Sequence, residues 1–542
     1  MEKEFTQQFI SLLYPSEASK NAHREPGGRP NISEAVTEEL GLTEIFHLKN
    51  ASLTEFFTHD PAVIAYRQQT VKDCLECPEL RDALARVRPI LDDIRQLRIL
   101  EGDASARDAY LYSITEIELY VSSLRTLYEG LSPLTDKLHS PAFTALSSLL
   151  CELCESEYYR ELNEKLTALS QRVHEIKSIT VGVNLDAQLR PTGAGVLSVN
   201  AESFKSGKML DKILRLSFRN DAFTCIAPLT PLGKGQSENR QEALMGAFNG
   251  AIEEVYHNAV KGWRAIVDEY VLDSTDFLLQ LIPEIEFLSR SCEMLDRLRN
   301  HPGCAITFPE LAPKEDKAFF AEGLYNPRVA LAIDDEIVTN DLDFDNDAKI
   351  YVLTGPNRGG KSVITVAVGA AQSMLQLGLP VPAKHARLSV VDGIFTHFPE
   401  GADDTIDKGR LGEECARLRE IFDAISEDSM ILLDESLSST GAYEAAYIAS
   451  EILVAFGARR VRGMFSTHLH ELAATIGDIN DRSVAAGGIR LDTLVAGMEE
   501  GRRSFRIRRA KPDGRSYARD IADKYGLSFE NLMRREGHHE ED

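Results

Sequence analysis

The chain has 542 residues and a formal net charge of −25, with 43% hydrophobic and 27% charged residues. This composition is typical of globular proteins and excludes a chain that is disordered throughout. No stretch reaches the roughly 18 consecutive apolar residues of a membrane span, and the N-terminal residues lack a signal-peptide pattern. Because the eight cysteines are also spread along the chain, we expect a cytoplasmic protein. The acidity argues against a general polyanion binder, although a local basic patch can still hold nucleic acid.

Charge and hydrophobic pattern differ between the two parts of the chain. Residues 1–346 carry 35 basic and 55 acidic side chains, whereas residues 347–542 carry 25 basic and 30 acidic side chains. Long stretches of the first part, such as 62–100, have apolar residues at helical spacing. Residues 178–232 instead show Val/Ile alternation with Gly and Pro, which favours short strands and turns. We therefore expect a helical domain over 1–325 with a small β-containing insert at 178–232.

From about residue 326 short apolar runs alternate with helical segments. The runs at 349–355, 429–436 and 462–468 have the length and composition of buried parallel strands. The sequence therefore predicts an α/β domain over 326–542 that ends in a helical segment. The predicted fold class of the whole chain is α followed by α/β.

The clearest motif is a phosphate-binding loop. The sequence GPNRGGKS at 355–362 matches G-x-x-x-x-G-K-[ST] and stands between an apolar run and an amphipathic stretch. Its glycines allow backbone N–H groups to surround phosphate oxygens, and the following helix adds its positive end. Lys361 can bridge the β and γ phosphates, and the Ser362 hydroxyl can ligate Mg²⁺. The residues expected to hold the nucleotide are Gly355, Pro356, Asn357, Arg358, Gly359, Gly360, Lys361, Ser362 and Val363.

Two further apolar runs deliver polar residues to the end of a strand. ILLDE at 431–435 ends in two acids, and in this context Asp434 is expected to hold Mg²⁺ through water and Glu435 to act as general base. The run at 462–468 ends at His468, which is placed to sense a γ-phosphate. A structural hydrogen bond at a strand end is the alternative for His468. The predicted catalytic residues are Glu435, His468 and Lys361.

Together these segments resemble the MutS family of DNA mismatch-repair ATPases, a branch of the ABC-type ATPases. The resembling residues are TGPNRGGKS (354–362), LLDESLSST (432–440) and STHLHEL (466–472), with weaker similarity in VTNDLDF (338–344), FTHFPEGADD (395–404) and DGRSYARDIADKYGLS (513–528). The good match covers roughly residues 325–535. The helical part resembles the family's core and lever domain in its long helical segments and in the fragment 66–84. It also has a β-rich insert where the family has its clamp.

The resemblance implies a homodimer that binds ATP and Mg²⁺ in two composite sites. In the family the partner subunit supplies a signature segment, which falls near residues 407–422 here. The family has Ser-Thr-Phe at the contact, whereas this chain has Gly409, Arg410 and Leu411. Either Arg410 or backbone N–H groups near Gly409 replace the serine, or catalysis across the dimer is weak. Arg410 is equally well explained as an arginine finger and as a solvated residue at a helix start.

The resemblance also bears on the pocket for the adenine base and on the N-terminal region. The apolar residues that hold adenine in the family fall at Ile337 and Val338, so an aliphatic pair replaces an aromatic one. The mismatch-reading domain that precedes the core in the family's repair proteins has no room here, because the helical pattern begins almost at residue 1. Mismatch reading of the family's kind is therefore not expected.

A local basic stretch is the candidate DNA contact. Residues 177–232 carry seven basic and four acidic side chains, at the position where the family's clamp grips the DNA backbone. A solvated helix face explains the same spacing.

The sequence thus favours a MutS-like ATPase that works as an ATP-driven dimeric clamp on DNA, in repair or recombination. The alternatives are a nucleotide-dependent protein-interaction switch that binds no DNA, and an ABC-type ATPase of other purpose.

Overall fold

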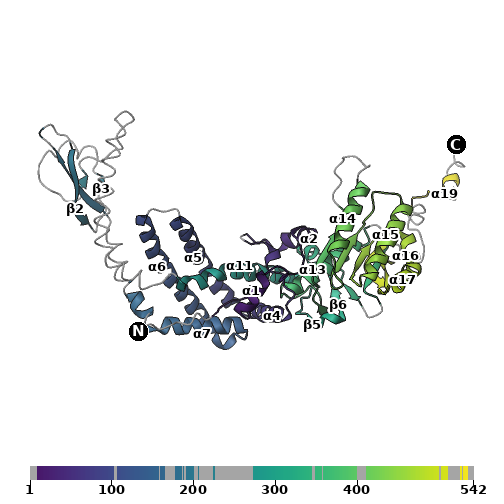
Figure 1. Ribbon diagram of the computed structural model, residues 1–542, viewed down its shortest axis with the longest axis horizontal. Helices are drawn as coiled ribbons and strands as arrows, with labels where there is room; N and C mark the ends of the chain where they lie inside the picture. Colours follow the sequence, from purple (N-terminus) through teal and green to yellow (C-terminus); the bar gives the residue numbers. More distant parts are fainter. Residues whose placement is uncertain are drawn as a thin grey trace, which may run out of the picture. The chain divides into compact units, whose positions relative to one another are not determined.

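The structure is a computed structural model that combines helices and sheets, as predicted (Figure 1). It describes residues 9–49, 51–102, 106–157, 159–164, 166, 178–185, 187, 191–200, 205–206, 224–225, 273–344, 348–356, 358–399, 410–499, 502–510, 525–527 and 529–534. Two compact units are interleaved along the chain. The first unit comprises Met1–Leu84, Leu134–Leu146 and Gln280–Asp542, and the second unit comprises Ala85–Pro133 and Ser147–Leu279. A boundary between functional domains at residues 325 and 326 stays a prediction.

The second unit is built from long helices and a small antiparallel sheet. Its described elements are most of α5 (Pro78–Gly102), α6 (Ala106–Leu131), part of α7 (Pro141–Glu155), β1 (Ser178–Leu185), β2 (Pro191–Asn200), β3 (Lys205–Ser206), β4 (Thr224–Cys225) and the start of α11 (Asp273–Asn300). Strands β1 and β2 pair antiparallel. Both strands lie in the segment 178–232, most of which beyond residue 200 is outside the described residues. Among the helices that the structure describes, none is both long and apolar enough to cross a bilayer.

The first unit begins with helices that, apart from the third, are N-capped by a serine or aspartate side chain. They are α1 (Glu17–Arg24), α2 (Glu34–Glu39), α3 (Leu42–Phe46), η1 (Leu53–Glu55) and α4 (Pro61–Glu76). The 3-10 helix η2 (Ser132–Lys137) leads into the unit's next segment, Leu134–Leu146. Side chains of Ser16 and Ser33 accept hydrogen bonds from the first turns of α1 and α2. Asp60 does the same for α4, whose first residue is a proline, as is common at that position.

A six-stranded sheet forms the centre of the first unit, in the order β10-β11-β12-β8-β13-β14. Its strands are β8 (Ile350–Thr354), β10 (Ile394–His397), β11 (Met430–Asp434), β12 (Arg462–Ser466), β13 (Leu491–Glu499) and β14 (Arg502–Arg509). The five strands from β10 to β13 run parallel, and β14 pairs antiparallel with β13 at the edge. All residues of β8, β11 and β12 are buried, which agrees with the continuous apolar runs in their sequences.

Helices cover both faces of this sheet. They are α13 (Lys361–Gln376), α14 (Arg410–Ala424), α15 (Ala442–Ala458), α16 (His470–Ala474) and α17 (Ile476–Ala485), and a further helix, α19 (Phe529–Arg534), follows the sheet in the sequence. Ile431 and Leu433 of β11 belong to a core that α14, α15 and α17 complete. Met464 of β12 points to the opposite face, where Thr365 of α13 contacts its sulfur at 3.3 Å. The sheet is therefore wound on both sides, and its parallel strands end together at one edge.

The N-terminal residues belong to the first unit because they pack against α13. A Cβ at Gly369 would lie 2.5 Å from Leu40 and 2.6 Å from Leu432, so glycine allows the helix to fit between α2 and β11. Beyond the end of α13, Gly378 packs against the side chain of Arg67 from α4. The Arg67 guanidinium is buried and donates to backbone carbonyls of residues 13 and 56. These contacts hold the helix that follows the glycine loop.

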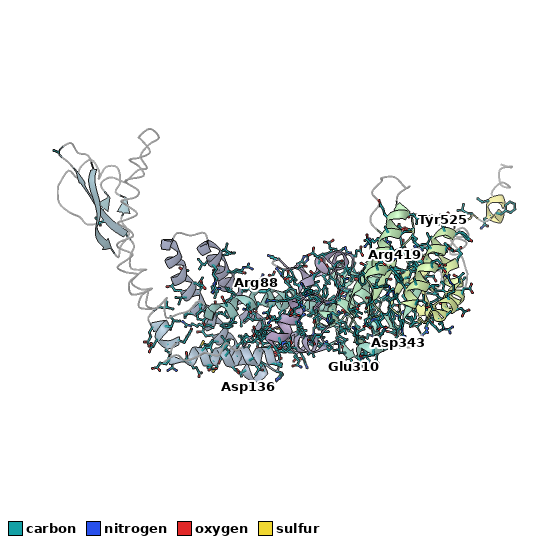
Figure 2. All side chains as sticks on the ribbon, viewed as in Figure 1. Arg88, Asp136, Glu310, Asp343, Arg419 and Tyr525 are labelled. Carbon is teal, nitrogen blue, oxygen red and sulfur yellow. The ribbon has the colours of Figure 1, made fainter. Side chains whose placement is uncertain are left out.

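A second sheet has four strands in the order β5-β9-β6-β7. Its elements are β5 (Glu310–Ala312), β6 (Phe319–Leu324), β7 (Asn340–Asp343) and β9 (His385–Ser389), with η3 (Lys314–Asp316) and α12 (Pro327–Ala332) in the connections. Its edge strands carry exposed acidic residues, Glu310 on β5 and Asp343 on β7, both labelled in Figure 2. Charges on edge strands oppose unwanted pairing with other chains.

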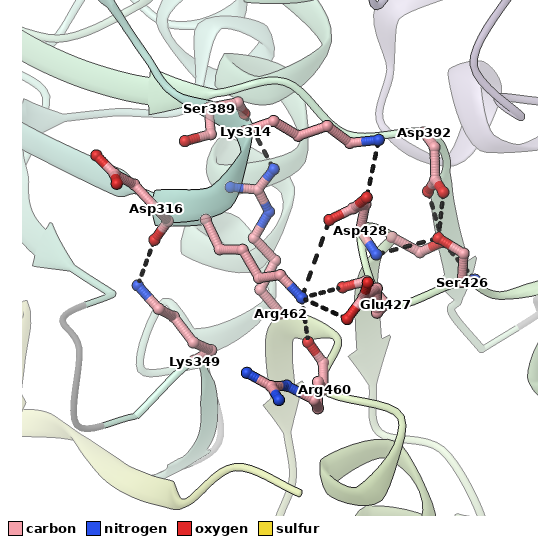
Figure 3. Close-up of polar contacts among 12 residues, drawn as sticks. Lys314, Asp316, Lys349, Ser389, Asp392, Ser426, Glu427, Asp428, Arg460 and Arg462 are labelled. Atoms are coloured by element: carbon pink, nitrogen blue, oxygen red, sulfur yellow. Dashed lines mark hydrogen bonds and ion pairs between the residues drawn. The ribbon is translucent and has the colours of Figure 1, made fainter.

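Arg462 on β12 ties this sheet to the larger one. Its buried guanidinium donates to the carbonyl oxygens of Ala318 at 3.0 Å, Ser389 at 3.0 Å and Val390 at 2.6 Å. Salt bridges surround it, including one of 2.8 Å between Lys314 and Asp428 (Figure 3). Burial lowers the pKa of Arg462 to about 10, and the group stays charged at neutral pH because that value is still high.

Candidate functional site

The glycine loop joins the buried strand β8 to α13. Gly355 has φ +142° and Gly360 has φ +91°, backbone conformations that residues with a Cβ rarely adopt. A Cβ at Gly355 would also lie 2.7 Å from the Cβ of Ala496 on β13. The loop therefore needs glycine for both conformation and space. Gly360 is the N-cap of α13, so the unpaired N–H groups of the first helical turn face the loop.

Lys361 is the first residue of α13 and its side chain is buried. Its Nζ donates to the carbonyl oxygens of Gly355 and Pro356, both at 3.2 Å, and lies 3.3 Å from Nδ1 of His468. Burial lowers the pKa of Lys361, whereas the charges of Glu435 and Asp434 raise it. The ammonium group is therefore held inside the loop, close to where phosphate oxygens would bind.

Asp434 and Ser362 provide oxygen atoms suited to Mg²⁺. Asp434, the last residue of β11, is 5% exposed, and among the described residues its Oδ1 has no hydrogen-bond partner. Burial raises the pKa of this carboxyl to about 6, while hydrogen bonding from Ser362 lowers it. A buried carboxylate oxygen without a partner beside an exposed hydroxyl fits a hard divalent cation. The residues present therefore fit the predicted metal.

Glu435 and His468 form a hydrogen-bonded pair. His468 Nε2 lies 2.5 Å from Oε1 of Glu435, and each side chain is 35% exposed. Because the Lys361 ammonium can only donate, His468 Nδ1 accepts from it, and Nε2 therefore carries the proton that is donated to Glu435. Glu435 itself has φ +47°, and its backbone N–H donates to the carbonyl of Ser466 at 2.8 Å. The strand ends thus bring Lys361, His468 and Glu435 into one chain of contacts.

A cavity of about 440 Å³ opens beside this chain of contacts. Its polar part is lined by Lys361, Ser362 and Glu435, together with Arg358, Gly359 and Gly360 of the loop. Its apolar part includes Ile337, Val338 and Val363, of which Val338 is 39% and Val363 is 43% exposed. The structure therefore places most predicted nucleotide-binding residues around one cavity whose lining combines charged and apolar side chains.

Some predicted residues fall outside what the structure describes. Asn357 and Gly409 lie outside the described residues, as does most of the basic segment 177–232. Arg410 begins α14, but only its backbone is described. The roles proposed for these residues in nucleotide, partner and DNA binding therefore stay predictions.

Several cavity residues were not predicted from the sequence. They come from the segment between the end of β6 and the start of β7, from α13 and from β14: Leu324, Tyr325, Asn326, Val329, Ile333, Glu336, Asn340, Ile364 and Phe505. The similarity in VTNDLDF already pointed to the neighbourhood of Asn340. Strand β14 lies at the edge of the larger sheet. Nothing in its pattern indicated that Phe505 lines the cavity.

Comparison with known protein families agrees with this geometry. The family model for MutS domain V matches residues 351–490, which include the loop, β11 and His468. The model for the MutS2 N-terminal domain matches residues 59–301. Together the two models cover most of the chain between residues 59 and 490.

Individual relatives are similar to the chain over parts of their length. "Endonuclease MutS2" of Streptococcus equi subsp. equi is 34% identical over 194 residues, 35% of this chain and 24% of that protein. "DNA mismatch repair protein MutS" of Caldanaerobacter subterraneus subsp. tengcongensis is 30% identical over 41% of this chain and 25% of that protein. The protein of the same name from Synechococcus sp. is 27% identical over 77% of this chain and 47% of its own length. The chain thus spans between about a quarter and a half of these relatives.

Proposed function

The chain belongs to the MutS family, and we propose that it is an ATPase that uses ATP and Mg²⁺ to drive a dimeric clamp on DNA in repair or recombination. The observation that carries the proposal is the cavity lined by the glycine loop, Lys361, Ser362 and Glu435, with His468 in contact with both Lys361 and Glu435. The proposal includes a helical core and lever domain over 1–325 and an ATPase domain over 326–542. The free thiols of the described cysteines suit a cytoplasmic protein.

Each residue has a defined task in this proposal. N–H groups at the start of α13 bind phosphate oxygens, and Lys361 exchanges its bonds to two loop carbonyls for bonds to phosphate. Ser362 and Asp434 hold Mg²⁺, which would neutralise phosphate charge when bound. Glu435 orients the attacking water and takes its proton, and His468 holds the Glu435 carboxylate in place until then. The site works by positioning and electrostatics rather than through a covalent intermediate.

The dimeric arrangement follows from the family resemblance. Gly409 and Arg410 would reach the γ-phosphate in the ATP site of a second copy, at the start of α14. A dimer that closes on ATP would then move the helical core and lever. The molar mass of the Glu435→Gln variant tests this part of the proposal, because this variant should bind ATP without hydrolysing it. Light scattering should then show twice the monomer mass in the presence of Mg·ATP.

The DNA contact rests on the basic segment 177–232 and on the relatives' names, which include DNA mismatch repair. The acidic excess of residues 1–346 favours the second candidate, a nucleotide-dependent protein-interaction switch. The two candidates share the ATP site and differ in what the closed dimer binds. They therefore predict different responses of the ATPase rate to DNA.

The decisive experiment measures ATP hydrolysis by the full chain with linear, mismatched and branched DNA over a salt series. Stimulation that fades as salt rises would support a clamp that contacts phosphates. A robust rate that no DNA changes would support the protein-interaction switch. Lys361→Ala should remove turnover while Lys384→Ala, the loss of an exposed lysine, should not. A folded Lys361→Ala variant with normal turnover would refute the proposed ATP site.

A further inference from the structure

The turn that follows β11 holds Glu435 in a strained conformation. Glu435 has φ +47° and Leu437 has φ +66°, so two residues with a Cβ occupy the left-handed region on either side of Ser436. Strain of this kind persists only where neighbouring groups fix the backbone, and it is concentrated at functional sites. The contacts of this turn therefore decide where the proposed general base points.

The first and last residues of the turn are anchored in the sheet and in the core. The backbone N–H of Glu435 donates to the carbonyl of Ser466 on β12 at 2.8 Å. The Leu437 side chain is 1% exposed and belongs to the core that α14, α15 and α17 complete. Neither of these contacts involves Ser436, which lies between the two strained residues.

His397, the last residue of β10, holds Ser436 from the strand on the other side of β11. The Ser436 hydroxyl donates to the carbonyl oxygen of His397 at 3.2 Å and lies 2.8 Å from Nδ1 of its ring. Because a hydroxyl has a single proton, Ser436 accepts from Nδ1, and this nitrogen carries a ring proton. Both side chains are buried. Two buried hydrogen bonds thus tie the middle of the turn to β10.

A second cavity shows why the turn needs this tie. A space of about 160 Å³ is lined by His397 and Ser436 and also by Glu435, which lines the nucleotide cavity as well. Glu435 therefore borders open space on two sides, and packing alone does not fix its carboxylate. His468 contacts the carboxylate at the nucleotide cavity, and the tie to His397 fixes the turn at the second cavity.

We propose that His397 is a positioning residue for ATP hydrolysis, which fixes the turn through Ser436 so that the Glu435 carboxylate faces the attacking water. This inference rests on the proposed ATP site and adds a residue to which the sequence motifs gave no task. The phosphates keep their partners in the glycine loop and at Lys361. The tie should therefore affect turnover and leave nucleotide binding unchanged.

The test compares two amides that place their N–H donor at different points of the histidine ring. The side-chain nitrogen of asparagine takes the place of Nδ1, and that of glutamine takes the place of Nε2. His397→Asn should therefore retain kcat, whereas His397→Gln and His397→Ala should lower it by about 10-fold, the effect of one lost buried hydrogen bond. Isothermal titration calorimetry should give an unchanged Kd of Mg·ATP for all three variants. His385→Ala, the loss of an exposed histidine on β9, is the control and should leave kcat unchanged.

Combined substitutions show whether His397 acts through the turn. His397→Ala with Ser436→Ala should lower kcat little more than either change alone, because both break one tie. Should His397→Ala fail to fold, Ser436→Ala breaks the same tie by a smaller change. A normal kcat in the folded variant that lacks the tie would overturn the inference.

Equal losses of kcat in His397→Asn and His397→Gln would also overturn it, as would a Kd of Mg·ATP that rises as kcat falls. If the unmodified chain hydrolyses no ATP, the proposed function itself fails. If Lys361→Ala removes turnover while His397→Ala turns over normally, only the positioning inference fails.

Discussion

Replacing Asp434 by asparagine should stabilise the metal-free protein while removing its ATPase activity. Asp434 is 5% exposed, and burial raises its pKa from 3.8 to about 6. Each pKa unit corresponds to about 1.4 kcal/mol, so the ionised carboxylate costs the folded state about 3 kcal/mol at neutral pH. Asparagine carries no charge and avoids this cost. The asparagine side chain also lacks the anionic oxygen that Mg²⁺ requires. The same substitution should therefore lower turnover and raise stability.

The pH dependence gives the sign of this effect. Because the folded pKa lies above the unfolded value, the folded state binds more protons between about pH 6 and pH 4. The unmodified protein should therefore gain stability as the pH falls through this window. The advantage of Asp434→Asn should be largest at pH 7, up to about 3 kcal/mol, and should vanish below about pH 4.

Calorimetric unfolding in EDTA from pH 7 to pH 4 would measure this difference, with Asp481→Asn as a control at an exposed position of α17. The control should leave the unfolding temperature nearly unchanged at every pH. Adding Mg·ATP should raise the unfolding temperature of the unmodified protein and not that of Asp434→Asn. The reasoning is refuted if Asp434→Asn is the less stable protein at pH 7 in EDTA, or if its advantage does not shrink with falling pH.

Three further predictions concern other buried polar groups. Ser436→Ala removes a hydroxyl that lies 2.8 Å from Nδ1 of His397 and anchors the turn after Glu435. Steady-state kinetics should therefore show kcat lowered by about 10-fold with KM unchanged. The control Ser436→Thr keeps a hydroxyl and should retain kcat. Burial lowers the pKa of His23 to about 4, so the protein should lose up to about 3 kcal/mol as the pH falls from 6.5 to 4; His23→Gln should lack this loss in urea unfolding. Arg462→Met removes the hydrogen bonds that Arg462 donates to three buried carbonyls, of which those of Ala318 and Ser389 keep a second donor. The change should cost about 1–3 kcal/mol, measured as a lower unfolding temperature, whereas an unchanged temperature would show that the Val390 carbonyl finds another partner.

Local patterns in the sequence were sufficient to predict the phosphate loop and the strands that deliver Asp434 and His468. A glycine loop between an apolar strand and a helix is a local arrangement, since its conformation depends on residues that are neighbours in the chain. Parallel strands end at a common edge, so the apolar runs before Asp434 and His468 were enough to expect them near the loop. The family resemblance rests on the same segments.

Contacts between distant segments could not be predicted in this way. The packing of Leu40 on Gly369 and of Arg67 on Gly378 brings residues before 85 into the same compact unit as the loop, which the helical pattern of those residues does not indicate. Helical periodicity shows which face of a helix is buried and not which partner buries it.

The Phe505 ring shows the same limit at the site itself. The direction of the ring depends on a left-handed backbone that Asn340, 165 positions earlier, holds through hydrogen bonds to the backbone of residues 505 and 507. The sequence by itself therefore determined the glycine loop and the residues at the adjoining strand ends, because each of these segments is contiguous in the chain. Only the tertiary structure decided which other side chains line the cavity, because they come from distant segments that meet through strand order.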